Sequence, residues 1–112
     1  MSKQLVLSIK QKYFDEIKAG TKKIETREVR PATEKRYVIL NADREIIDII
    51  KYDTIKFLTG AYSGIRESMI VEVLGAQLDE VHDENDQPII YEENGEENMM
   101  IDIVYDLGKI IS

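Results

Sequence analysis

Three charged residues that can do chemistry together, Lys22, Glu25 and Arg27, lie in the stretch GTKKIETREVR, residues 20–30. A lysine becomes a general base or a strong hydrogen-bond donor when desolvation or a neighbouring cation lowers its pKa. A glutamate can hold a cation in position or activate a water, and an arginine can bind a carbonyl, phosphate or carboxylate through two parallel hydrogen bonds. The stretch therefore predicts a polar site in which Lys22 and Glu25 are catalytic candidates and Arg27 binds a ligand.

A helix and a strand must position these side chains. The segment KQKYFDEIKAG, residues 10–20, spaces Tyr13, Phe14 and Ile17 as one helical face, and Gly20 suits the left-handed conformation that ends a helix. The β-branched residues of 24–29 then favour a strand, which Pro31 ends. Because side chains alternate along a strand, Glu25 and Arg27 share one of its faces and lie within reach of each other.

Further strands are indicated over residues 4–9, 37–40, 53–60 and 68–78. Residues 44–53 fit a short helix or a strand, and we favour a strand. Asn94-Gly95 lies between two apolar runs, which is the strongest local signal for a hairpin, and we expect residues 88–105 to form one. Many short strands with one clear helix predict an α+β fold, a small β-barrel or half-open barrel.

Composition excludes several classes of protein. The chain has 112 residues and no cysteine, so we expect one domain without disulfides or a thiolate metal site. No apolar run has the length that a membrane span needs, which predicts a cytoplasmic protein without a membrane partner. The residues point to no cofactor and no metal; the acidic stretch around His82 lacks the spacing and the glycine of a calcium loop.

The charge is divided unevenly along the chain. Residues 1–37 hold ten Lys and Arg against five Asp and Glu, whereas residues 38–112 hold five against seventeen, and the net charge is −7. A protein that binds duplex nucleic acid mainly through phosphates needs the opposite overall sign. We therefore expect no duplex DNA as partner, and a small anionic ligand or a few nucleotides at a local basic site.

The stretch GTKKIETREVR, together with the helix predicted before it, resembles the ASCH domain of the PUA-like superfamily. The hallmark of that family is a helix that ends in glycine, followed by G-x-K-x-x-E-x-R. Gly20, Lys22, Glu25 and Arg27 fill the named positions, and LSIKQKYFDEIKAG is similar to the family's first strand and helix. The resemblance implies that residues 1–112 form one domain, a small PUA-like β-barrel with one or two helices packed at its ends. It also implies a cleft beside the motif and RNA or a nucleoside-type small molecule as partner.

Three further residues are candidate ligand-binding groups. Tyr62, in the loop TGAYSG, is placed to stack on a base, and Arg66 to add a phosphate contact at the same loop. Glu72 follows Val71 on a strand and is a candidate further carboxylate of the cleft.

Three functions stay open at this point. Binding of RNA or a nucleoside-type ligand is the first hypothesis. The alternative follows from small members of the family that resemble amidohydrolases, which remove an acyl group from N4-acylcytidines with a lysine, a threonine and a glutamate. Lys22 matches the lysine, but Glu25 occupies the threonine position, so that a water activated by Glu25 would replace a nucleophile. The third hypothesis is a protein-interaction adaptor that uses the acidic part of the chain.

Overall fold

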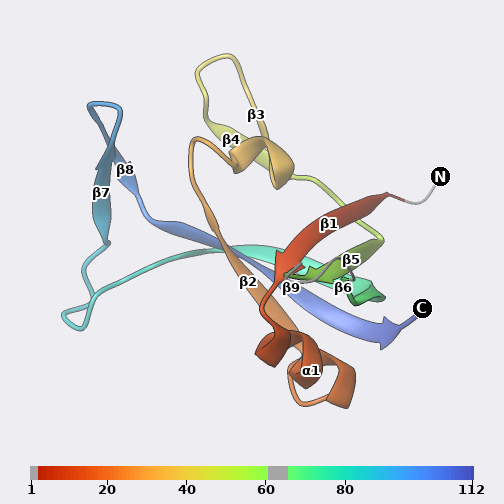
Figure 1. Ribbon diagram of the computed structural model, residues 1–112. Coiled ribbons are helices and arrows are strands. Elements are labelled where there is room, and N and C mark those ends of the chain that lie inside the picture. The colour runs from red at the N-terminus through yellow and green to blue at the C-terminus, as the bar shows by residue number, and fades with distance from the viewer. Residues whose placement is uncertain (1–2, 61–65) are drawn as a thin grey trace. The chain divides into compact units, whose positions relative to one another are not determined.

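The computed structural model describes residues 3–60 and 66–112. The elements among these residues are β1 (Gln4–Ile9), α1 (Gln11–Ala19), β2 (Ile24–Val29), the 3-10 helix η1 (Glu34–Arg36), β3 (Val38–Leu40), β4 (Ile46–Ile49), β5 (Thr54–Thr59), β6 (Ser68–Glu80), β7 (Ile90–Glu93), β8 (Glu96–Met99) and β9 (Ile101–Ile110) (Figure 1). Strands dominate, and the predicted α+β class is confirmed. Five strands form one sheet in the order β1-β5-β6-β9-β2, while β3-β4 and β7-β8 are two-stranded.

The chain divides into two compact units. The first comprises residues 1–25, 51–75 and 105–112, and the second comprises residues 26–50 and 76–104. Strands β2, β6 and β9 each contribute residues to both units.

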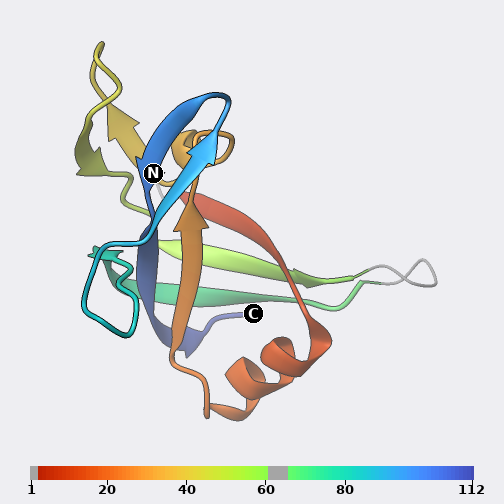
Figure 2. The ribbon, with the colours of Figure 1, turned by 90° about the vertical axis from the view of Figure 1, so that its left-hand side faces the viewer.

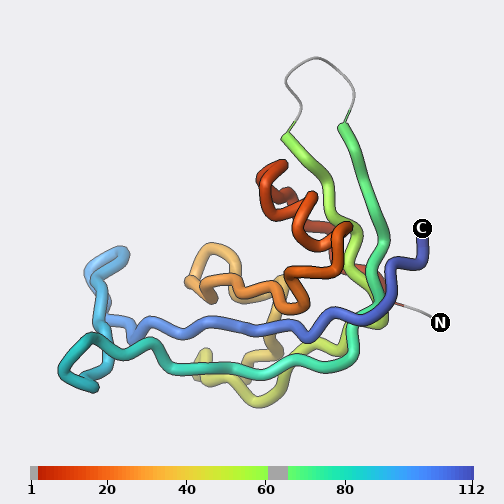
Figure 3. Tube along the Cα trace, turned by 90° about the horizontal axis from the view of Figure 1, so that it is seen from below, coloured from red at the N-terminus to blue at the C-terminus, as the bar shows by residue number. Residues whose placement is uncertain are grey.

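Alternating side chains of three strands form the core of the first unit. β1 runs parallel to β5 with Leu7 opposite Phe57, and β5 pairs in antiparallel fashion with β6. The inward positions of these strands and of α1 are buried, namely Leu5, Leu7, Ile9, Phe14, Ile17, Ile55, Phe57, Met69 and Val71. Each buried aliphatic or aromatic side chain contributes roughly 1.5–3 kcal/mol. Helix α1 lies beside β5, as the view in Figure 3 shows, so that Phe14 and Ile17 complete this core.

The second unit contains both hairpins. β3 and β4 pair in antiparallel fashion, so residues 44–53 include a strand rather than a helix, as predicted. β7 and β8 turn at Asn94-Gly95, both with positive φ of 55° and 79°, which is the geometry of a two-residue hairpin turn (Figure 2).

The predicted hairpin is confirmed at its turn but is shorter than residues 88–105. β8 ends at Met99, and the N–H of Met100 donates to the carbonyl of Ile89 at 2.8 Å. From Ile101 the chain enters β9, a strand of the five-stranded sheet. The change of partner allows Ile103 to become fully buried, which an isolated two-stranded arm does not offer.

No helix among residues 3–60 and 66–112 is long and apolar enough to cross a membrane.

Candidate functional site

Backbone hydrogen bonds fix the junction between α1 and β2. Gly20 has a φ of 83°, and its N–H donates to the carbonyl of Ile17 at 3.0 Å, so the helix ends at Ala19 as predicted. The N–H groups of Thr21 and Lys22 both donate to the carbonyl of Glu16, at 3.0 and 3.1 Å. These bonds are typical of glycine-terminated helices. They hold the backbone of Lys22 against the last turn of the helix.

The two catalytic candidates meet directly after this junction. The Nζ of Lys22 lies 3.7 Å from Oε1 of Glu25, and the side chains are 23% and 8% exposed. This distance exceeds that of a hydrogen bond, so the contact is an ion pair. Alternation along β2 turns Glu25 inward while Ile24 stays 48% exposed. A carboxylate this buried must be compensated, and Lys22 supplies a positive charge for it.

Tyr13 adjoins this pair and is a residue that the sequence reasoning missed. Its ring centroid lies 5.4 Å from the Nζ of Lys22 and 5.8 Å from the Nζ of Lys12. The helical spacing suggested a core position for Tyr13, but the residue is 40% exposed, whereas Phe14 and Ile17 are buried. One signal was available in the sequence: tyrosine carries a hydroxyl that prefers water, so it suits the edge of a buried helical face better than its centre.

Arg27 lies two residues beyond Glu25 on β2, within the second unit, and is half-buried. Along this strand Glu25 and Val29 are buried, so Arg27 occupies the intervening position of the same alternating set. Its role as a ligand-binding residue stays a prediction.

Arg66 and Glu72 have protein partners in the first unit. Arg66 donates from Nε to the carbonyl of Thr59 at 2.6 Å and from Nη2 to the Oγ of Ser8 at 3.0 Å, which ties together the ends of β5 and β1. Glu72 alternates with the fully buried Val71 and therefore lies on the opposite sheet face, where its Oε1 accepts the N–H of Lys109 at 3.5 Å. The ligand contacts of Arg66 and Glu72 stay predictions, and Tyr62 lies outside the described residues.

A cavity of about 440 Å³ opens where β1 passes into α1. It is lined by Ser8, Ile9, Lys10, Gln11 and Gly60. The wall therefore combines the carboxyl ends of two parallel strands with the start of a helix, a common place for ligands in α/β architectures. Lys10 provides a cationic side chain on this wall.

A second group of charges lies in the second unit and was not singled out in the sequence. Arg30 bonds Glu28 at 2.8 Å and stacks over the ring of Tyr91 at 4.6 Å. The hydrogen bond that Arg30 donates to the carboxylate of Glu28 raises the pKa of Arg30. Burial, followed by the charges of Glu28 and Asp79, raises the pKa of Asp102. No group of three or more His, Cys, Asp or Glu side chains among the described residues could hold a metal ion.

The comparison with protein-family models bears on all of these features. The model of the ASCH domain matches residues 7–101, which is most of the chain. The chain belongs to the ASCH domain family. The resemblance read from the glycine, lysine, glutamate and arginine of residues 20–27 is confirmed, and so is the small PUA-like α+β barrel fold that it implied. Neither the search of curated proteins nor the search of solved structures found a match.

Because the chain belongs to the ASCH family, the ion pair at the junction can be compared with the family motif. An ASCH domain is a PUA-like module of a generally RNA-binding family. The lysine and the glutamate of the ASCH motif are the two residues that the structure pairs at 3.7 Å. The motif thus encodes a helix stop, a cation and a buried carboxylate within six consecutive residues, Gly20 to Glu25.

Proposed function

We propose that this ASCH domain binds RNA or a nucleoside-type ligand at the site around Lys22 and Glu25, with Arg27 as a further ligand-binding residue. The observation that carries the proposal is the ion pair of Lys22 with a carboxylate that is only 8% exposed. The buried carboxylate orients the lysine, and the ammonium group is still partly accessible. An ammonium has three hydrogen-bond donors, so one or two can reach a ligand while the charge stays compensated.

Bases and phosphates offer the acceptors that such a group recognises. The ammonium of Lys22 suits a base carbonyl, a ring nitrogen or a phosphate oxygen. The guanidinium of Arg27 suits the same acceptors through its planar set of donors. Glu25 then acts chiefly on the position of Lys22, because its side chain is almost fully covered.

The amidohydrolase is a second candidate, favoured by the same juxtaposition of a carboxylate and an ammonium. Glu25 would accept a proton from water while the water oxygen bonds to the acyl carbon of an N4-acylcytidine. The electron pair of the carbonyl would move onto its oxygen, where the ammonium of Lys22 stabilises the negative charge. Collapse of this intermediate breaks the bond to N4, N4 takes the proton from Glu25, and cytidine leaves together with a carboxylic acid, which loses its proton to the solvent.

One experiment separates the two candidates. Cytidine, N4-acetylcytidine and a short single-stranded RNA are each added to the purified protein, and the melting temperature and the release of acetate are measured. A ligand at a hundred times its Kd stabilises the native state by about 2.7 kcal/mol, which a melting curve resolves. Stabilisation without acetate supports binding alone, and release of acetate supports hydrolysis.

Two variants and a control test the residues. Lys22→Met keeps the apolar stem and removes the ammonium, and Glu25→Gln keeps the shape and removes the charge. Both should lose the ligand response, whereas Lys23→Ala should keep it, because Lys23 is exposed and lies one residue away. Unchanged stabilisation by ligand in Lys22→Met would show that the site lies elsewhere, and no response of the wild type to any of the three probes would refute the proposed function.

A further inference from the structure

The ring of Tyr13, on the exposed side of α1, has two ammonium groups close to it. The Nζ of Lys12 is 5.8 Å and the Nζ of Lys22 is 5.4 Å from its ring centroid. Both distances lie within the range of cation–π attraction, which draws the cations to the ring. Tyr13 is nevertheless 40% exposed as a residue, which leaves room for a planar group to approach it.

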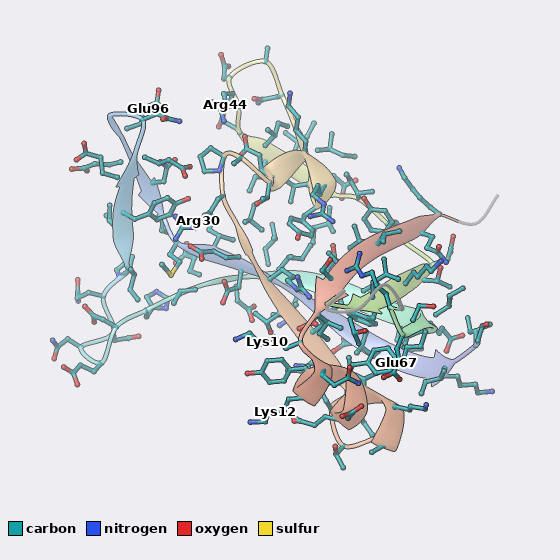
Figure 4. The ribbon with its side chains drawn as sticks, viewed as in Figure 1. Lys10, Lys12, Arg30, Arg44, Glu67 and Glu96 are labelled. Carbon is teal, nitrogen blue, oxygen red and sulfur yellow. The ribbon has the colours of Figure 1, made fainter. Side chains whose placement is uncertain are left out.

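Two lysines near this ring are not engaged in ion pairs with the described residues. Lys22 is paired with Glu25, but neither Lys10 nor Lys12 forms an ion pair with a carboxylate of the described residues. Two carboxylates beside the start of α1 accept hydrogen bonds from Gln11, whose Nε2 donates to Asp15 at 3.0 Å and to Glu67 at 3.2 Å. Figure 4 shows Lys10 and Lys12 on one side of α1 and Glu67 on the other.

Lys10 connects this surface to the cavity at the start of the helix. It lines the cavity of about 440 Å³, and its carbonyl accepts the N–H of Tyr13 at 3.0 Å, so the two residues are one helical turn apart. The cavity with Lys10 on its wall therefore opens one helical turn from Tyr13.

We propose that Tyr13 stacks on a base while Lys12 and Lys10 bind its phosphate, so that the ligand is a phosphorylated nucleotide unit rather than a free nucleoside. This inference rests on the proposed function, since it takes Lys22 and Glu25 as the neighbouring part of the same site. An exposed aromatic ring with lysines close to it combines the two features with which proteins bind single-stranded nucleic acid, a stacking platform and positive charge. A neutral nucleoside would leave the two uncompensated ammonium groups without a partner, whereas a phosphate satisfies them.

Two sources supply such a unit, a free nucleotide and an RNA strand. Isothermal titration with cytidine, cytidine 5′-monophosphate and an oligocytidine hexanucleotide compares them. The monophosphate should bind about tenfold or more tightly than cytidine, in line with a charge-assisted contact. A free-nucleotide protein binds the monophosphate as tightly as the hexanucleotide. An RNA-binding protein binds the hexanucleotide more tightly, and its affinity falls with added salt. Either result supports a phosphorylated ligand.

Three variants assign the roles. Tyr13→Leu should weaken both cytidine and the monophosphate by about tenfold, the size of one lost base stack, and Tyr13→Phe should restore the affinity because it keeps the ring. Lys12→Gln should weaken the monophosphate alone and reduce the salt slope of hexanucleotide binding by about 0.7. Lys18→Gln, an equal charge change in the last turn of the same helix, is the control and should have no effect. Melting curves identify any variant that fails to fold; if Tyr13→Leu does, Lys12→Gln carries the test, because Lys12 is exposed.

Equal affinities for cytidine and the monophosphate, with Lys12→Gln indistinguishable from the wild type, would overturn this inference. The proposed function would still stand in that case if Lys22→Met abolished the binding. Absence of binding by all three probes would refute the proposed function, and the inference with it.

Discussion

The ion pair between Lys22 and Glu25 should contribute measurably to the stability of the domain. Glu25 is 6% exposed as a residue, and the pair sits where the helix passes into β2. Lys22→Met removes the ammonium but keeps most of the apolar stem. Glu25→Gln keeps the shape of the side chain and removes its charge. The two single variants and the double variant form a double-mutant cycle, which isolates the interaction between the two side chains.

The structure sets the size of this coupling. At a separation of 3.7 Å, two unit charges attract by about 1 kcal/mol in water and by about 4–5 kcal/mol at an effective dielectric constant of 20. The distance is too long for a charge-assisted hydrogen bond, and Lys22 is still 23% exposed, so the lower part of this range applies. We expect a coupling of about 1–2 kcal/mol, and a loss of about 1–3 kcal/mol in Lys22→Met, because the buried carboxylate then loses the ammonium that lies 3.7 Å from it.

Urea unfolding of the four proteins at neutral pH measures both quantities. Lys23→Ala is the control, since this lysine is exposed next to the pair. The coupling should change little when salt is added, because a largely buried pair is poorly screened. A coupling of only a few tenths of a kcal/mol that disappears with salt is the behaviour of a solvated surface pair. That result would refute the reasoning that the site is built on a compensated buried carboxylate.

Three further outcomes are expected. Gly20→Ala should destabilise the domain by roughly 1–2 kcal/mol in urea unfolding, since Gly20 has a φ of 83° and a side chain there is strained; no loss would contradict the helix stop. Asp102→Asn should raise stability at neutral pH, and its advantage should vanish below pH 3.8, because the pKa of Asp102 is raised from 3.8 on folding and the native state holds the proton more tightly; equal stability at both pH values would contradict the burial of this carboxyl. An RNA duplex should show no binding in an anisotropy titration at physiological salt, because residues 38–112 carry a balance of −12; tight, length-dependent binding would contradict this.

The elements that carry the site were predictable because their local signals agree. Residues 4–9 show the pattern of a strand. The helix before Gly20 and the strand before Pro31 each combine a residue pattern with a following residue that ends the element. Residues 44–53 were ambiguous, since two pairs of isoleucines around Asp48 fit either a helix or a strand. The pairing of β4 with β3 decides for a strand, and that is a tertiary interaction that no local pattern contains.

The end of the β7–β8 hairpin was not predictable for a related reason. Apolar residues continue from Met99 through Met100 into Ile101, so the sequence shows one run where the structure has two strands. The exchange of partners at Met100 depends on which strand can bury Ile103 and Tyr105, both fully covered in the structure. Strand length from pattern alone is therefore an upper limit wherever an apolar run can serve two sheets.

In the candidate site, too, some positions follow from local sequence signals and others depend on tertiary packing. The proximity of Lys22 and Glu25 follows from a helix stop and a strand alternation, both of which are written locally in the motif. The position of Tyr13 instead depends on how far α1 is rotated about its own axis, and the burial of Phe14 and Ile17 at 2% and 4% exposure decides that rotation. With these two side chains in the core, Tyr13 is left at the edge of the buried face, where its hydroxyl can reach water and its ring lies beside Lys12 and Lys22. The same core that stabilises the helix therefore presents the aromatic ring to the site, and a substitution that shrinks Phe14 should disturb ligand binding through the orientation of Tyr13 as well as through stability.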